Sequence, residues 1–104
     1  MTQIDEKEFE DLRSKEGKML ILFSADWCGP CKILKPQLDS LANEIPGVFP
    51  FYSIDVNDSE KVTKEFGIRN IPTGIILENG EEKTRFLGAK PKDQIKKLLE
   101  NFLV

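Results

Sequence analysis

Cys28 and Cys31 are the residues of this chain best suited to chemistry, and they are its only cysteines. They belong to the run Trp-Cys-Gly-Pro-Cys-Lys at positions 27–32, which follows an apolar stretch and precedes a helical pattern. In this context a Cys-x-x-Cys pair is typical of a redox site. At the first turn of a helix, free backbone N–H groups and the helix dipole would favour the thiolate of Cys28, which is the nucleophilic form. Cys31, one turn further on, is close enough to form a disulfide with it.

Gly29 and Pro30 suit the same place, because glycine lets another chain approach closely and proline needs no N–H in a first helical turn. Two other interpretations of the cysteine pair stay open. A zinc site requires four ligands, and the chain has no histidine and no second cysteine pair, so we expect no metal. The pair can also be purely structural, since free cysteine is commonly buried. Redox chemistry is the interpretation that we favour.

The elements that position the pair follow from the hydrophobic pattern. The apolar run 19–24 is typical of a strand buried on both faces. A helix should follow the cysteines and reach about Asn43, and Pro36 should bend it because proline removes a helix hydrogen bond. One face of that helix carries apolar residues at steps of four, three and four: Leu34, Leu38, Leu41 and Ile45.

Further elements are predicted on either side of this unit. Asp5 and Glu8 can form a capping box at the start of a first helix, and Gly17 should end that helix. Little chain precedes Asp5, so a first strand should be short or absent. Residues 48–55 predict the next strand, although Pro50 is unusual there because proline avoids central strands.

The last third of the chain predicts two helices and a hairpin. Ser59 can cap a short helix, and residues 75–77 and 83–87 predict two strands joined by the Asn79-Gly80 turn signal. Pro91 should open the last helix. The apolar stripe of that helix is Ile95, Leu98, Leu99 and Phe102. The whole order predicts an α/β fold in which helices cover both faces of a central mixed β-sheet.

Composition limits the classes of function. The length fits one domain, residues 1–104, and a net charge of −3 offers no basic face for nucleic acid. No apolar run approaches the roughly 20 residues that cross a membrane, so we expect no membrane contact. The first residues are neither basic nor apolar, as a signal peptide would be, so we expect a cytoplasmic location. We also expect a monomer.

The run at positions 27–32 resembles the active site of the thioredoxin family, and further segments agree with it. Pro36 resembles the kink of the active-site helix in that family. Residues 66–73 resemble the segment that carries its cis-proline, and residues 79–81 and 87–89 resemble its later turn and the loop that borders the active site. The resemblance covers nearly the whole chain and implies a thioredoxin fold.

The resemblance also implies a role for each site residue. Cys28 would be the nucleophile and Cys31 the resolving cysteine, and the two would form a redox-active disulfide. The Ile71–Pro72 bond would be cis, although X–Pro bonds in general are mostly trans. The backbone of Ile71 would pair with an extended substrate segment. The implied substrate-binding residues are Trp27, Gly29, Pro30, Ile71, Pro72, Gly88 and Ala89.

A protein-disulfide reductase is therefore the predicted function, with a place in electron transport and cell redox homeostasis. No cofactor is expected. The implied partners are disulfide-containing proteins and a thioredoxin reductase linked to NADPH or ferredoxin. Alternatives are a specialised thioredoxin-like protein that general reductases serve poorly, and a non-enzymatic binding module or holdase using the apolar rim near Trp27. An oxidant or isomerase is less compatible with the Gly-Pro dipeptide between the cysteines.

Two positions depart from the family pattern. Thioredoxins typically carry a buried aspartate six residues before the first cysteine, and Leu22 stands there in this chain. The lysine that usually partners that aspartate is matched by Phe51. Replacing a buried ion pair by packed apolar residues is often neutral or stabilising. Leu22, however, has no group that could take up the proton of Cys31.

Overall fold

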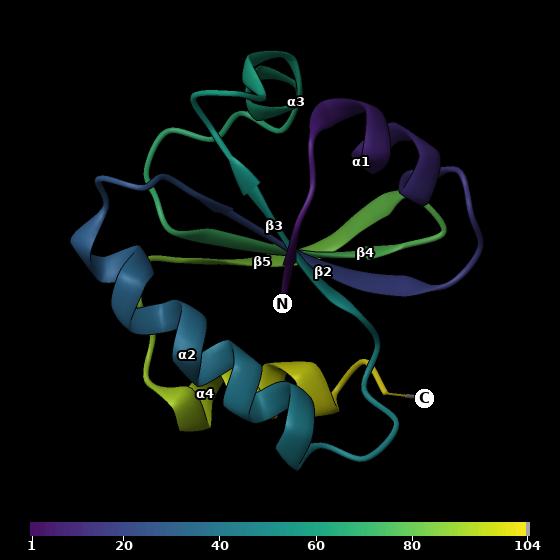
Figure 1. Ribbon diagram of the computed structural model, residues 1–104. Coiled ribbons are helices and arrows are strands. Elements are labelled where there is room, and N and C mark those ends of the chain that lie inside the picture. The colour runs from purple at the N-terminus through teal and green to yellow at the C-terminus, as the bar shows by residue number, and fades with distance from the viewer. Residues whose placement is uncertain (104) are drawn as a thin grey trace.

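The computed structural model describes residues 1–103 and shows a five-stranded mixed sheet with helices on both faces (Figure 1). The elements in chain order are β1 (Thr2–Gln3), α1 (Glu6–Arg13), β2 (Lys18–Ser24), α2 (Gly29–Glu44), β3 (Phe51–Asp55), α3 (Glu60–Glu65), β4 (Thr73–Glu78), β5 (Glu81–Leu87) and α4 (Lys92–Glu100). The strand order is β1-β3-β2-β4-β5. β3 runs parallel to both β1 and β2, whereas β4 is antiparallel to β2 and β5. The predicted order of elements is confirmed, and the first strand, which was expected to be short or absent, has two residues.

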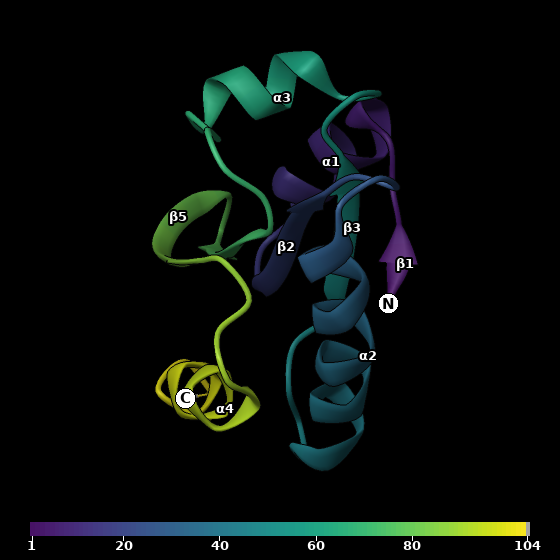
Figure 2. The ribbon, with the colours of Figure 1, turned by 90° about the vertical axis from the view of Figure 1, so that its left-hand side faces the viewer.

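β2 lies in the middle of the sheet, and its side chains point alternately into the cores on the two faces of the sheet. Leu20 and Leu22 pack with residues of α2 and α4, while Ile21 and Phe23 pack with Phe9 of α1 and with residues of α3. Figure 2 shows α2 and α4 together, away from α1 and α3. Burial on both faces explains why β2 is a continuous apolar run.

The first helix begins as predicted but ends earlier. Asp5 Oδ1 accepts a hydrogen bond from the Glu8 N–H at 2.8 Å, and Glu8 Oε1 accepts one from the Asp5 N–H at 3.1 Å, which completes the capping box. The helix ends at Arg13, so the prediction that Gly17 ends it is wrong. Ser14 is the C-cap residue, and its hydroxyl donates to the Asp11 carbonyl at 2.8 Å.

The third strand is shorter than predicted. It begins at Phe51, not at residue 48, because Pro50 has no N–H to donate to a ladder. The Pro50 carbonyl still accepts from the Leu20 N–H at 2.9 Å. On the outer edge β1 pairs only with Tyr52 and Ser53, so Pro50 has no partner strand on that side.

The N-terminus of α3 is capped by a different residue from the one expected. Ser59 occupies the N-cap position, but its hydroxyl makes no cap bond and is buried without a hydrogen-bond partner. Glu6 of α1 caps α3 instead, because its Oε1 accepts from the N–H groups of Lys61 at 2.7 Å and Val62 at 3.3 Å. One helix therefore satisfies the free N–H groups of another.

The hairpin between β4 and β5 turns at the predicted place. Asn79 and Gly80 have φ angles of 54° and 84°, as the tight two-residue hairpin turn requires. The turn is tied to the loop after α1, since the Gly17 N–H donates to Asn79 Oδ1 and the Asn79 N–H donates to the Gly17 carbonyl, both at 2.8 Å. Both strands extend a few residues beyond the predicted ranges because their ladder continues to the turn.

Candidate active site

Cys28 and Cys31 lie where β2 gives way to α2. Cys28 is the N-cap of α2, and its Sγ accepts a hydrogen bond from the Cys31 N–H at 3.2 Å. The two cysteines form a disulfide, with their Cα atoms 5.3 Å apart. The Cys28 N–H donates to the Ala25 carbonyl at 3.2 Å, which closes the turn that leads into the helix. The sulfur of Cys28 thus lies at the positive end of the helix, where a thiolate is stabilised.

The two cysteines differ in exposure. Cys31 is completely buried, and Cys28 is 5% exposed. Together with Ala25 they form a small buried cluster, against which Val56 and Ile71 pack. An incoming sulfur can therefore reach Cys28 more easily than Cys31.

Segments distant in sequence surround the disulfide. The Ile71–Pro72 bond is cis, as predicted. The Pro72 carbonyl accepts from the Gly88 N–H at 2.8 Å, which joins the loop after β5 to the segment before β4. Ala89 is exposed, and its place in the site rests on its neighbour Gly88 alone.

The remaining predicted residues form the outer surface. Gly29 and Pro30 are exposed in the first turn of α2, and Trp27 is 70% exposed just before it. Trp27 and Ile71 lie on one hollow of about 120 Å³. The other residues that line this hollow are Val56, Thr63, Ile68 and Arg69.

Sequence reasoning did not assign those four residues to the site. Ile68 and Arg69 belong to the segment 66–73 that resembles the family, which was a usable signal. Val56 directly follows β3, which neighbours the strand leading to the cysteines. Loops at the carboxyl ends of adjacent parallel strands meet at one edge of a sheet, and this rule could have found it.

Leu22 and Phe51 lie in the core beneath α2. Leu22 is completely buried and Phe51 is 6% exposed, and both belong to the cluster shared by the sheet, α2 and α4. In the ladder Phe51 pairs with Leu20 and Leu22 pairs with Ser53. The apolar surroundings expected at these positions are therefore observed.

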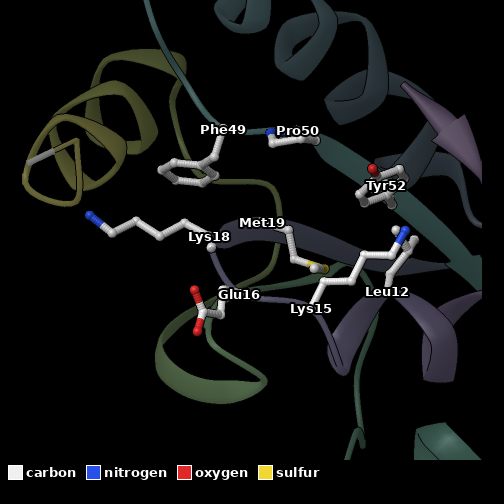
Figure 3. A pocket seen from close by; sticks show the side chains of 9 residues that line it. Leu12, Lys15, Glu16, Lys18, Met19, Phe49, Pro50 and Tyr52 are labelled. Carbon is white, nitrogen blue, oxygen red and sulfur yellow. The ribbon is translucent and has the colours of Figure 1, made fainter.

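A larger hollow lies at the other end of β2. It has a volume of about 480 Å³, and Lys15, Lys18 and Phe49 are among the residues that line it (Figure 3). It adjoins the start of β2, whereas the disulfide follows the end of that strand. None of the predicted site residues lines it.

Two structural features are absent from residues 1–103. No group of three His, Cys, Asp or Glu side chains in this part of the chain could hold a metal ion. The helices of the same part are too short or too polar to span a membrane.

A Cys-x-x-Cys disulfide at a helix N-cap, facing a cis-proline segment on this sheet, defines the class of thioredoxin-fold proteins. The family model named Thioredoxin matches residues 1–101, and the chain belongs to that family.

Individual relatives agree with this assignment. A chloroplastic M-type thioredoxin of Zea mays is 36% identical over 100 residues, which cover 95% of this chain and 60% of the relative. A thioredoxin of Chlamydia muridarum is 42% identical over 83 residues, 80% of each chain. Among solved structures, a mutant thioredoxin from Halobacterium salinarum matches with a TM-score of 0.88 at 29% identity, covering 99% of this chain and 90% of that one. The chain spans about half the length of the chloroplastic relatives.

Proposed function

We propose that this chain is a thiol–disulfide oxidoreductase that reduces disulfides in other proteins. The observation that carries the proposal is the Cys28–Cys31 disulfide at the N-cap of α2, with Cys28 the more accessible sulfur. A disulfide of this kind, once reduced, supplies two electrons to a substrate disulfide. The same cycle accounts for a role in electron transport and cell redox homeostasis.

The reaction proceeds in two exchanges. The Cys28 thiolate attacks one sulfur of the substrate disulfide, and the other substrate sulfur leaves as a thiolate. Cys31 then loses its proton and attacks Cys28 in the mixed disulfide. The reduced substrate is released, and the Cys28–Cys31 disulfide is formed again.

The proposed substrate surface would lie beside Cys28. Trp27 and Ile71 border the hollow beside the cysteines, and the exposed first turn of α2 leaves the approach open. An extended substrate segment would lie along the Ile71–Pro72 backbone, in the manner of an added strand. Gly88 and Ala89 would form the other border.

The partners and the location of the chain belong to the same proposal. A thioredoxin reductase, linked to NADPH or ferredoxin, would regenerate the dithiol. We propose a single-domain monomer in the cytoplasm. The chlamydial relative is compatible with this location, whereas the chloroplastic relatives point to a plastid, and cell fractionation decides between them.

A binding module or holdase is the second candidate, because the chain exposes large apolar side chains. Trp27 is 70% exposed, Ile33 64% and Leu87 55%. Exposed apolar residues often mark interaction surfaces where they form a contiguous patch. Cys28→Ser separates the two functions, since a holdase would keep its activity and a reductase would lose it.

Insulin reduction tests the proposed function. The chain is assayed with dithiothreitol, with an NADPH-linked reductase and with a ferredoxin-linked reductase, and Cys28→Ser serves as the control. We expect turnover with dithiothreitol and with at least one reductase, and none with the variant. Turnover with dithiothreitol alone would favour the specialised protein that general reductases serve poorly.

A further inference from the structure

The second exchange of the proposed reaction needs an acceptor for the proton of Cys31. Burial in an apolar site disfavours a thiolate, and Cys31 is completely buried. Leu22, which lies in the core shared with α2, cannot accept a proton. Water, the departing substrate thiolate or another group near the start of α2 can accept it instead.

Asp55 has the burial expected of such a group. Within residues 1–103 it is the one acidic residue that is buried, at 8% exposure, and the other buried polar residues are Ser24, Ser53, Ser59 and Thr73. Its Oδ1 accepts from the Asn57 N–H at 2.8 Å. Its second carboxylate oxygen remains available for another donor.

The sheet register places Asp55 on the face that α2 covers. Phe51, Ser53 and Asp55 alternate along β3 with Tyr52 and Ile54, so these three share one face. Phe51 packs in the core with α2, and Tyr52 and Ile54 pack in the opposite one.

The polar end of that face lies next to the disulfide. Ser24 is the ladder partner of Asp55, and the next residue, Ala25, packs against both cysteines. Val56, which follows Asp55, packs against the same cluster, and its N–H donates to the Ser24 carbonyl at 2.9 Å. Ser24 and Asp55 are thus each followed in sequence by a residue that contacts the cysteine cluster.

We propose that Asp55 accepts the proton of Cys31 through one water molecule. This inference rests on the proposed reductase function. The proton passes from the Cys31 sulfur to the Asp55 carboxylate, and the Cys31 thiolate forms its bond to Cys28. The bond between Cys28 and the substrate breaks, and the substrate leaves as a thiolate that takes up the proton from Asp55. The substrate disulfide is reduced and the dithiol is oxidised, so no further reagent is needed.

Single-turnover kinetics test this role. The reduced protein is mixed with a disulfide-containing peptide, quenched in acid at intervals and analysed by mass spectrometry, which gives the rates at which the Cys28 adduct forms and decays. The central variant is Asp55→Asn, whose side-chain oxygen can still accept from the Asn57 N–H. Asp55→Ser, whose hydroxyl can form a similar turn, is used instead if Asp55→Asn does not fold. The exposed Asp58→Asn and Asp26→Asn are controls.

We expect adduct formation to be unchanged and adduct decay to slow by about a hundredfold in Asp55→Asn, the low end of what general bases contribute. Asp55→Glu should restore most of the decay rate, and both controls should behave like the unmodified protein. An unchanged decay rate in a folded Asp55→Asn overturns the proposal. So does equal slowing by either control, or failure of Asp55→Glu to restore the rate. If the unmodified protein forms no Cys28 adduct, the reductase function itself has failed, which is a separate result.

Discussion

At the scale of single residues, the chain keeps the cysteines of its family and replaces the buried charges around them. Leu22 and Phe51 fill the space beneath α2 with apolar atoms. A buried charge is costly unless a partner compensates it, so losing both partners together preserves the core. The proposed consequence is a different route for the proton of Cys31.

Placing a single charge at Leu22 should show how much an unpaired charge destabilises this core. Leu22→Asp should lower the free energy of unfolding by about 3 kcal/mol or more, because an unpaired polar group enters an apolar site. Adding Phe51→Lys should recover part of the loss. Urea unfolding at pH 7 measures both, with Leu22→Asn as the uncharged control. An undiminished stability of Leu22→Asp would show that the site is more polar than the structure indicates.

Ser59 gives a prediction of the opposite sign. Serine at an N-cap usually stabilises a helix by about 1 kcal/mol, but this hydroxyl makes no cap bond and is buried without a partner. Ser59→Ala should therefore leave the free energy of unfolding unchanged or raise it by up to about 1 kcal/mol. Glu6→Ala, which removes the group that caps α3, should lower it. Thermal unfolding of both variants tests the assignment, and a clear loss in Ser59→Ala contradicts it.

At the scale of elements, local patterns predicted the helices and strands, and tertiary contacts decided their ends. The capping box at Asp5 and the turn at Asn79 are local, and both were predicted. The cap of α3 by Glu6 was not, because the two segments are 55 residues apart in sequence. The end of α1 was also missed, since glycine is a common but not a necessary stop.

The hairpin turn holds the sheet against the loop after α1, which makes Gly80 sensitive. A Cβ there would lie 2.6 Å from the Arg13 carbonyl oxygen, and the residue has a φ of +84°. Gly80→Ala should lower the free energy of unfolding by more than about 1 kcal/mol. Gly47→Ala is the matched control, because Gly47 has a φ of +74° and nothing within 4 Å of its Cβ position. If the two substitutions cost the same, the contact with Arg13 contributes nothing.

Arg13 joins α1 to α3. Its guanidinium lies 5.1 Å from the centre of the Phe9 ring and 5.3 Å from that of Phe66, and it forms an ion pair with Glu65 at 2.7 Å. The hydrogen bond from Arg13 lowers the pKa of Glu65.

The ion pair between Arg13 and Glu65 predicts that the stability of the protein depends on pH. A carboxyl whose pKa is lowered by folding stabilises the protein above its unfolded pKa, and the contribution is lost as pH falls through the folded value. Glu65→Gln should therefore reduce stability by about 0.5 kcal/mol at pH 7, the range of exposed pairs. The difference from the unmodified protein should disappear in acid. Urea unfolding from pH 3 to 7, with the exposed Glu16→Gln as control, measures it. A difference that does not shrink as the pH falls would assign the effect to packing.

At the scale of the whole molecule, the sheet brings the proposed site together from three distant segments. The cysteines follow β2, Val56 follows β3, and the cis-proline segment precedes β4. The cysteine motif and the cis-proline were predicted from sequence because each is a short pattern. The burial of Asp55 and the hollow at Trp27 were not, because they depend on which strands lie side by side.

Trapping the mixed disulfide is the most direct test of the proposed reductase function. Cys31→Ser removes the resolving thiol, so the reduced variant mixed with a protein disulfide should accumulate a covalent adduct on Cys28. The unmodified protein should show that adduct only briefly, and Cys28→Ser should form none at a comparable rate. Mass spectrometry of the quenched mixtures identifies the cysteine that carries the adduct. An adduct on Cys31 in Cys28→Ser that forms as fast as the one on Cys28, or no adduct in Cys31→Ser, would contradict the assignment.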